Sequence, residues 1–344
     1  MMGQAARISQ LGLLAVGMSM GAALASTPQV ASADPYTDQS SWIDQLLSGL
    51  SVPAATTSPL DIQISISGMD LFSTVDNTAT ATSGPGDIAV AIGNGAVANA
   101  NGGILNFALA DGTNTFAETP LGANFDVAVA TGTASSANIG LGARFDFAFA
   151  DGPGSSANIG LGANLDRALA IGTGNSALVG VGSRMSTALS DGTGNSAVAG
   201  AGNGNLAEAF GAHSNAITVL GNGDLASATG GGTATAGGFL STAVANGANT
   251  TVSATGISDS AIAIGGNGDA QASGVGDIAL IFNNGSALDQ ATATLGDNLL
   301  AEVFGTGSSA TAGVGNWDLA AVFGDMLHAS ATGANFLLDI LPSL

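Results

Sequence analysis

The chain has 344 residues, of which 53 are Gly, 46% are hydrophobic and only 8% are charged. Its 25 acidic residues stand against four basic residues, all Arg, so no basic surface exists that could neutralise nucleic-acid phosphates or anionic lipid headgroups. Disulfides are excluded because there is no Cys, and a Gly share about twice the usual ~7% is unlike that of an ordinary packed globule. A repeat protein or a flexible low-complexity chain fits this composition better.

Residues 1–33 are typical of a cleavable signal peptide. Arg7 gives a positive start, an apolar run extends from Leu11 to Ala25, and a small-x-small motif stands at Ala31 to Ala33. The alternative is a membrane anchor, but the apolar run is shorter than the ~20 residues that a bilayer span needs. We therefore predict an exported mature chain of net charge −22 without a transmembrane span, with cleavage after Ala33 or, alternatively, after Ala25.

Residues 34–60 form a leader of different texture. Apolar residues recur at helical spacing after Ser41, namely Trp42, Ile43, Leu46, Leu47 and Leu50. This spacing predicts a short amphipathic helix followed by a Pro-containing linker. Such a helix is either a cap packed on the next domain or an element that docks to a partner or interface.

Residues 61–83 are predicted to hold the first strand and the N-terminal cap region of the domain that follows. Ile62, Ile64 and Ile66 alternate with polar residues, which is the period of a strand with one apolar side.

Residues 84–333 are periodic. Marker glycines recur every 20 residues in the regular part, at positions 112, 132, 152, 172 and 192. A second Gly marks the half-way turn of each unit, at positions 122, 142, 162, 182 and 202. Counting marker glycines over the whole region gives thirteen units, each made of two similar halves.

This period predicts an all-β fold, a parallel β-solenoid with one coil of about 19–20 residues per unit. Each half-coil would be a short strand and a turn in which Gly or Asn takes positive φ. Disorder is the alternative for a chain rich in Gly, Ala and Ser. Disorder requires low hydrophobicity, whereas this chain has a mean hydropathy of +0.41 and places apolar residues in fixed columns.

The columns indicate which strand face is inside. Positions 108 and 110 are Ala in almost every copy, whereas positions 107 and 111 carry charged residues in some copies. Because charges are hard to bury beside their own copies, we expect the Ala face inside. The column at 109, 129, 149, 169 and 189 would then be an exposed apolar ladder, which suggests self-association or a partner surface. The reversed arrangement, with this ladder as the core, stays open.

Acidic residues also recur in register. They form two columns and are the candidate metal ligands of the chain: Asp126, Asp146 and Asp166 in one, and Asp111, Asp151 and Asp191 in the other. Carboxylates ~4.8 Å apart repel each other by roughly 1 kcal/mol in water, so each column is expected to face solvent or to hold cations.

Four turns have the pattern Gly-x-Gly-Asp and resemble the calcium-binding nonapeptide turns of RTX proteins, with Asp one residue early: 84–87, 221–224, 266–269 and 274–277. Calcium is therefore the possible cofactor, and solvated turn Asp residues that satisfy local backbone donors are the alternative.

The sequence does not suggest an enzyme. It has two His residues, His213 and His328, no metal-ligand spacing, no nucleophile elbow and no phosphate loop. The even coil length leaves no long loop in which a polysaccharide-cleaving site would be built. The apolar segment 334–344 is predicted to cap the last coil, because an open coil presents unpaired strand edges.

Two families resemble this chain. The end of the signal peptide and runs such as residues 86–96 (GDIAVAIGNGA) resemble exported Gly/Ala-rich repeat proteins of mycobacteria of the PGRS-like kind, without a PE module. The runs at 89–93 and 259–265 are similar to head repeats of trimeric autotransporter adhesins. These resemblances imply a repetitive, adhesive surface protein and supply no catalytic residues.

The expected function is therefore that of a non-enzymatic, secreted or cell-surface protein, a structural or adhesive rod in the cell envelope. Its expected contacts are with itself or with a host or envelope surface, through the exposed repeat face. The alternative function is a calcium-dependent binding module that uses the Asp columns.

Overall fold

The computed structural model describes residues 61–247, 250–265, 268–281, 289–305, 307–333 and 337–342. The described residues all belong to one compact unit, which starts at residue 61. The predicted signal peptide at 1–33 and the predicted leader helix at 34–60 lie outside the described residues, so both stay predictions. The boundary at residue 61 coincides with the start of the predicted first strand.

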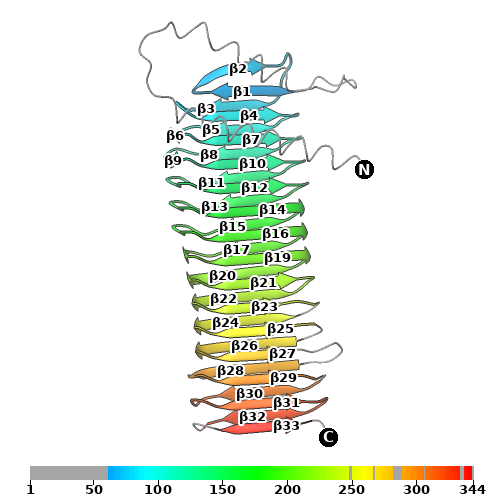
Figure 1. Cartoon of the computed structure of the whole chain (residues 1–344). Coiled ribbons are helices and arrows are strands. Elements are labelled where there is room, and N and C mark those ends of the chain that lie inside the picture. The colour runs from blue at the N-terminus through cyan, green and yellow to red at the C-terminus, as the bar shows by residue number, and fades with distance from the viewer. Residues whose placement is uncertain are drawn as a thin grey trace. The chain divides into compact units, whose positions relative to one another are not determined.

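This unit is an all-β parallel β-solenoid of about 13 turns with about 19 residues per turn, and its described residues form no helix. Figure 1 shows the coils stacked from the N-terminal end of this unit to its C-terminal end. The predicted fold class and period are therefore confirmed. Among the described residues, no helix has the length and apolar character that a bilayer crossing needs.

Each coil contributes one strand to each of two long sheets. The first sheet, sheet A, contains β2 (Met69–Ser73), β1 (Ile62–Ile66), β4 (Ile88–Ile92), β7 (Phe107–Asp111), β10 (Val127–Thr131), β12 (Phe147–Asp151), β14 (Arg167–Thr173), β16 (Thr187–Thr193), β19 (Leu206–Ala212), β21 (Leu225–Thr229), β23 (Thr242–Ala245), β25 (Ser260–Ala263), β27 (Ile278–Ile281), β29 (Leu300–Val303), β31 (Leu319–Phe323) and β33 (Leu338–Pro342).

The second sheet, sheet B, contains β3 (Thr80–Ser83), β5 (Val97–Ala100), β8 (Phe116–Thr119), β11 (Ser136–Ile139), β13 (Ser156–Ile159), β15 (Ser176–Val179), β17 (Ser196–Ala199), β20 (Asn215–Asn222), β22 (Thr233–Phe239), β24 (Thr251–Ile257), β26 (Gly268–Val275), β28 (Asp289–Asp297), β30 (Ser309–Gly313) and β32 (His328–Thr332). Short strands in the turn between the sheets are β6 (Gly103–Ile104), β9 (Ala123–Asn124) and β18 (Gly202–Asn203).

The register between coils follows the sequence period. In the regular part, each residue pairs with the residue 20 positions later, as Ala128 does with Ala148 and Ser136 with Ser156. Identical residues therefore stack in columns along the solenoid, which is why a 20-residue repeat specifies this fold.

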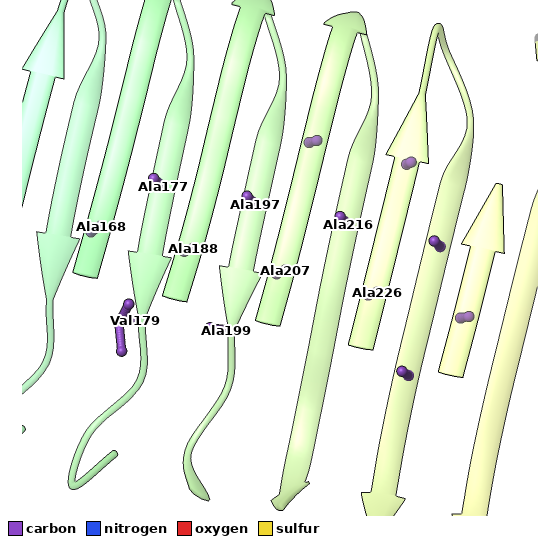
Figure 2. Packing of buried hydrophobic residues seen from close by; sticks show 14 of the residues in the cluster. Ala168, Ala177, Val179, Ala188, Ala197, Ala199, Ala207, Ala216 and Ala226 are labelled. Carbon is purple, nitrogen blue, oxygen red and sulfur yellow. The ribbon is translucent and has the colours of Figure 1, made fainter. Parts of the chain in front are cut away.

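The core is a set of Ala columns between the two sheets. In the regular coils, Ala128, Ala148 and Ala168 of sheet A and Ala157 and Ala177 of sheet B are completely buried. Figure 2 shows Ala168, Ala177 and the larger Val179 among the buried side chains of successive strands. This burial confirms the prediction that the Ala face is inside. The space between the two sheets is narrow, so it accepts methyl groups and few larger side chains.

The outer column at 109, 129, 149, 169 and 189 is not the exposed ladder that we predicted. Leu109 and Val129 are buried, and Phe149, Leu169 and Leu189 are only half-exposed. In-register stacking covers these side chains with the same column of the adjacent coils. This face of sheet A therefore lacks the bare apolar stripe that the sequence suggested.

The marker glycines allow close contact between turns. Gly152 has a φ of 107°, and a Cβ atom there would lie 1.9 Å from the carbonyl oxygen of Gly172 in the next coil. Only Gly fits such an approach, so the Gly period is a requirement of the stacking distance.

The two ends of the solenoid differ from its middle. At the N-terminal end, β1 pairs antiparallel with both β2 and β4, whereas the inner neighbours are parallel. At the C-terminal end, β33 extends sheet A, and Asp339 occupies the register position of the buried Ala320. The Asp339 Oδ2 atom accepts a 2.7 Å hydrogen bond from the backbone N–H of Ser330 on β32. The described part of the predicted cap is thus a further strand of the stack, and its role as a cap stays a prediction.

Candidate functional site

The Asp126, Asp146 and Asp166 column lies in a buried corner of the coil. Each residue directly precedes a strand of sheet A, and each is at most 1% exposed. The Oδ1 atom of Asp126 accepts a hydrogen bond from the backbone N–H of Asp146 at 2.8 Å, and Asp146 accepts from Asp166 at 2.7 Å. The expectation that this column faces solvent is wrong, because the side chains bond the backbone of the next coil instead.

The same corner is polar along most of the solenoid. The Asx and Ser side chains that take this position and are buried in other coils are Asp87, Asn106, Ser186, Asn205, Asp224, Ser241, Asp259, Asp277 and Asp318. Most of these side chains accept a bond from the equivalent backbone N–H one coil later, as Asp277 does from Leu299 at 2.9 Å. A buried backbone donor needs such a partner, so this corner column holds successive coils in register.

This finding also revises the reading of the Gly-x-Gly-Asp turns. Asp87, Asp224 and Asp277 end three of these turns, and all three are buried rather than solvated. Asp87 accepts from the backbone N–H of Asn106 in the next coil at 2.8 Å, so its partner is not a local one. The fourth turn is only partly described, and its Asp269 lies on β26.

Burial changes the acidity of these carboxyls. Desolvation raises the pKa of Asp126 to about 6 and that of Asp277 to about 6. Desolvation, with added repulsion from Asp126 and Asp166, raises the pKa of Asp146 to about 7. The Oδ2 atoms of Asp126 and Asp277 are buried without a hydrogen-bond partner, which further favours the neutral acid.

The second acidic column lies at the other end of the strands. Asp111, Asp151 and Asp191 are half-exposed or exposed where β7, β12 and β16 lead into the turn toward sheet B. The Oγ1 atom of Thr131 donates to the Oδ1 atom of Asp151 at 2.7 Å. The structure does not bring the two acidic columns together, because five strand residues, roughly 16 Å, separate them.

Calcium prefers six to eight oxygen ligands around one point. In the described ranges, no group of three or more His, Cys, Asp or Glu residues is gathered closely enough to hold a metal ion. Calcium binding by either column therefore remains a prediction from the sequence.

A different surface emerges in the turn between sheet B and sheet A. In the four coils from residue 121 to residue 185, eight large apolar side chains are 45–68% exposed in this turn, in two rows along the solenoid: Leu121, Leu141, Leu161 and Val181, and Phe125, Phe145, Leu165 and Met185. We call these eight residues the apolar edge. Monomeric proteins rarely expose so many apolar side chains side by side, so such a surface marks a binding site.

The backbone of this turn fixes the two rows at the coil spacing. The N–H of Phe145 donates to the carbonyl of Asn124 at 3.0 Å, and the N–H of Leu165 donates to the carbonyl of Arg144 at 3.0 Å. The rings of Phe125 and Phe145 stack with centroids 4.9 Å apart and planes 8° apart. The apolar edge is therefore an ordered ladder and not a set of scattered side chains.

The second row is held in an unfavourable backbone conformation. Phe125, Phe145, Leu165 and Met185 have φ angles of 55–62°, the left-handed region in which a bulky residue costs about 1–2 kcal/mol. In other coils this position holds large apolar residues as well, such as Leu105 and Leu240 with φ of 59° and 55°, or Gly204 with φ of 67°. Four adjacent coils thus accept strain to hold large apolar side chains in solvent, which supports a functional role for this row.

Between the two apolar rows runs a polar row of alternating type, which we call the Arg/Asn row. It contains Asn124, Arg144, Asn164, Arg184 and Asn203, and each pairs with the next by a parallel bridge. Arg144 and Arg184 are exposed, and they are two of the three basic residues that follow the predicted signal peptide. The apolar edge is therefore both strongly apolar and locally basic, on a chain that is acidic as a whole.

Sequence reasoning missed the apolar edge. The half-way glycines at 122, 142, 162 and 182 were identified as turns, but the residues beside them were not placed in columns. A signal was present: turns usually carry small or polar residues, whereas positions 121 and 125 repeat large apolar ones for four coils. The opposite turn, at residues 112–114, contains only Gly, Thr and Asn.

Comparisons with protein-family models, with curated proteins and with solved structures found no match to this chain.

Proposed function

We propose that this chain is a non-enzymatic, exported protein of the cell surface or envelope that acts as a structural and adhesive rod. The observation that supports this proposal is the regularity of the stack. From residue 107 to residue 212, strands of equivalent sequence pair in continuous register and present the same columns to solvent in every coil. A surface repeated at a fixed spacing suits multivalent attachment, in which many weak contacts act together.

The corner columns support a rod that holds its shape outside the cell. The chain has no Cys, so disulfides do not stabilise it. Hydrogen bonds between coils stabilise the stack instead, such as the bond that the backbone N–H of Ser186 donates to Oδ1 of the buried Asp166 at 2.6 Å. Completely buried Ala columns add apolar contact along the whole interior.

Export is tested by expressing the full chain and sequencing the N-terminus of the extracellular product. We expect a mature chain that starts at Asp34, and a variant with Leu13→Arg and Leu14→Arg to stay inside the cell because its apolar run is broken. An unprocessed, cytoplasmic wild-type chain would overturn the proposal.

The rod is tested by removing whole coils from the exported chain. Deletion of residues 147–166 and of residues 147–186 keeps the register, so both variants should fold. Attachment of expressing cells to polystyrene, and aggregation of those cells, should fall stepwise with coil number. Full loss on removing one coil, with no further effect of the second, would indicate a localised site and contradict the rod.

A further inference from the structure

We propose that two copies of this chain associate side by side along the apolar edge, with their solenoid axes antiparallel. The inference deepens the proposed structural role and rests on it, since it names the first partner of the rod. It starts from the eight exposed side chains of the apolar edge and the Arg/Asn row between them.

The exposed area is of the order that a stable dimer needs. A Phe side chain buries ~150–250 Å² and Leu, Val and Met somewhat less, so eight side chains that are about half-exposed offer several hundred Å² on each copy, and the Arg/Asn row between them adds to the contact area. A standard specific interface buries about 800 Å² per partner. A second copy brings an identical ladder with the same coil spacing, and a twofold interface requires such a self-complementary surface.

The order of the Arg/Asn row selects the antiparallel orientation. In an antiparallel pair centred between Arg144 and Asn164, Arg144 faces the partner's Asn164. By the same symmetry, Arg184 faces the partner's Asn124. In a parallel pair, Arg144 would face the partner's Arg144, and like charges at close range repel. The alternation of Arg and Asn therefore avoids charge repulsion in one orientation only.

The apolar rows also match in this orientation. Each row meets its own counterpart, so Phe145 lies against the partner's Leu165 and Phe125 against the partner's Met185. Each contact of the second row then pairs one Phe ring with Leu or Met, and the contacts of the first row pair Leu with Leu or Val. Met adapts its shape to the ring that it meets. In a parallel pair, by contrast, the row that contains Phe145 would face the partner's row that contains Leu141, with equivalent coils at the same height.

The acidic surface does not oppose this pairing. Asp111, Asp151 and Asp191 lie at the opposite turn of the coil, beyond the full width of the strand from the apolar edge. The Asp126 column lies next to the edge but is buried in the corner. Neither acidic column therefore presents exposed carboxyls on the apolar edge, and Arg144 and Arg184 lower the local negative charge there.

The first test measures oligomeric state by light scattering and analytical ultracentrifugation on the purified chain. We expect a dimer for the wild type. A variant with Phe125→Asn, Phe145→Asn, Leu165→Asn and Met185→Asn should be monomeric with at least hundredfold weaker association. Asn tolerates left-handed φ, so this variant should keep or raise its melting temperature.

A control variant carries Phe107→Asn and Phe147→Asn on the outer face of sheet A and should remain a dimer. A wild-type chain that stays monomeric at the highest concentration at which the purified protein is soluble would overturn the pairing. A dimer that persists in the Asn variant of the apolar edge would overturn it as well.

The second test resolves orientation, and the absence of native Cys makes it clean. In the antiparallel pair, Asn124→Cys alone lies three coil spacings, roughly 14 Å, from its copy and should not crosslink. Asn124→Cys combined with Arg184→Cys should form intermolecular disulfides on mild oxidation. Crosslinking of the single variant would show a parallel pair and overturn the proposed orientation.

These tests separate the pairing from the proposed function. If the chain is exported and supports attachment but is monomeric, the pairing is wrong and the rod stands. If the chain is retained in the cytoplasm but the purified protein is a dimer with the expected crosslink, the function is wrong and the pairing stands.

Discussion

Replacement of Asp146 by Asn is expected to stabilise the solenoid at pH 8. Asp146 is 1% exposed, and desolvation raises its pKa to about 7, so holding it ionised at pH 8 opposes folding. Asn keeps the Oδ1 acceptor for the N–H of Asp166 at 2.7 Å and removes the charge. Asn106 and Asn205 already occupy the same corner in other coils.

The magnitude follows from the pKa. A difference of about three units from the ordinary value of 3.8 corresponds to about 4 kcal/mol at most. Water that reaches the ionised corner reduces this figure to roughly 2 kcal/mol. The Oδ2 atom also accepts from the N–H of Arg144 at 3.3 Å, and loss of this contact costs about 1 kcal/mol. The net gain is then about 1 kcal/mol at pH 8.

The assay is urea unfolding followed by far-UV circular dichroism at pH 8 and at pH 4. At pH 4 Asp146 is protonated in the wild type, so the Asn variant should be equal or slightly less stable. Asp151→Asn, at the half-exposed end of the same strand, is the control and should show no gain at pH 8. A variant that is less stable than the wild type at pH 8, or that gains equally at both pH values, would refute the reasoning.

Three further outcomes are expected. The raised pKa values of Asp126 and Asp146 make the folded chain bind more protons than the unfolded chain between about pH 4 and pH 7. The melting temperature should therefore fall as pH rises through this range, and a rise would contradict the burial of these two carboxyls. Ala168→Leu overfills the interior and should cost about 1–3 kcal/mol in urea unfolding, whereas an outward Arg167→Leu should change stability by less than about 0.5 kcal/mol. Gly152→Ala places a Cβ 1.9 Å from a carbonyl oxygen and should lower the melting temperature far more than Gly162→Ala, which meets no atom within 4 Å and carries only the left-handed cost of about 1–2 kcal/mol.

The sequence predicted the fold well because the stacking distance imposes the period. Gly152 and its equivalents recur every 20 residues since no other residue fits the contact between turns, and a 20-residue register follows directly. The Ala interior was also predictable, because in the regular coils charged residues such as Arg167 and Asp191 occur in the columns that flank the Ala positions and not in the Ala positions themselves. Both signals are repeated many times, so single exceptions do not hide them.

The corner carboxyls were misplaced for a physical reason. The prediction treated Asp126, Asp146 and Asp166 as ionised groups in water, where a stacked column must face solvent or bind cations. In the structure each carboxyl accepts a hydrogen bond from a buried backbone N–H of the next coil, and burial raises the pKa of Asp126 and Asp146. The sequence holds a clue, since Asn106 and Ser186 share the column and neither is charged.

The sequence did not predict that the first strand, β1, pairs antiparallel with its neighbours. The alternation of Ile62, Ile64 and Ile66 is the same for a parallel and an antiparallel strand, so it predicts a strand without its partner orientation. Only the short turn at residues 67–68 before β2 indicates a hairpin, and the antiparallel pairing with β4 has no local signal.

The two ends of the solenoid differ from its middle in a way that opposes end-to-end polymerisation, to which every stack of parallel strands is prone. Such a stack has the geometry of a fibril, and an open first or last strand is a template on which further chains can add. Here β1 and β2 reverse strand direction at one end. At the other, Asp339 places a carboxyl group in the line of the Ala interior and takes the N–H of Ser330 that an added strand would need. We therefore expect the protein to remain a particle of defined length that does not polymerise end to end, although nearly every coil in its middle would accept another copy of itself.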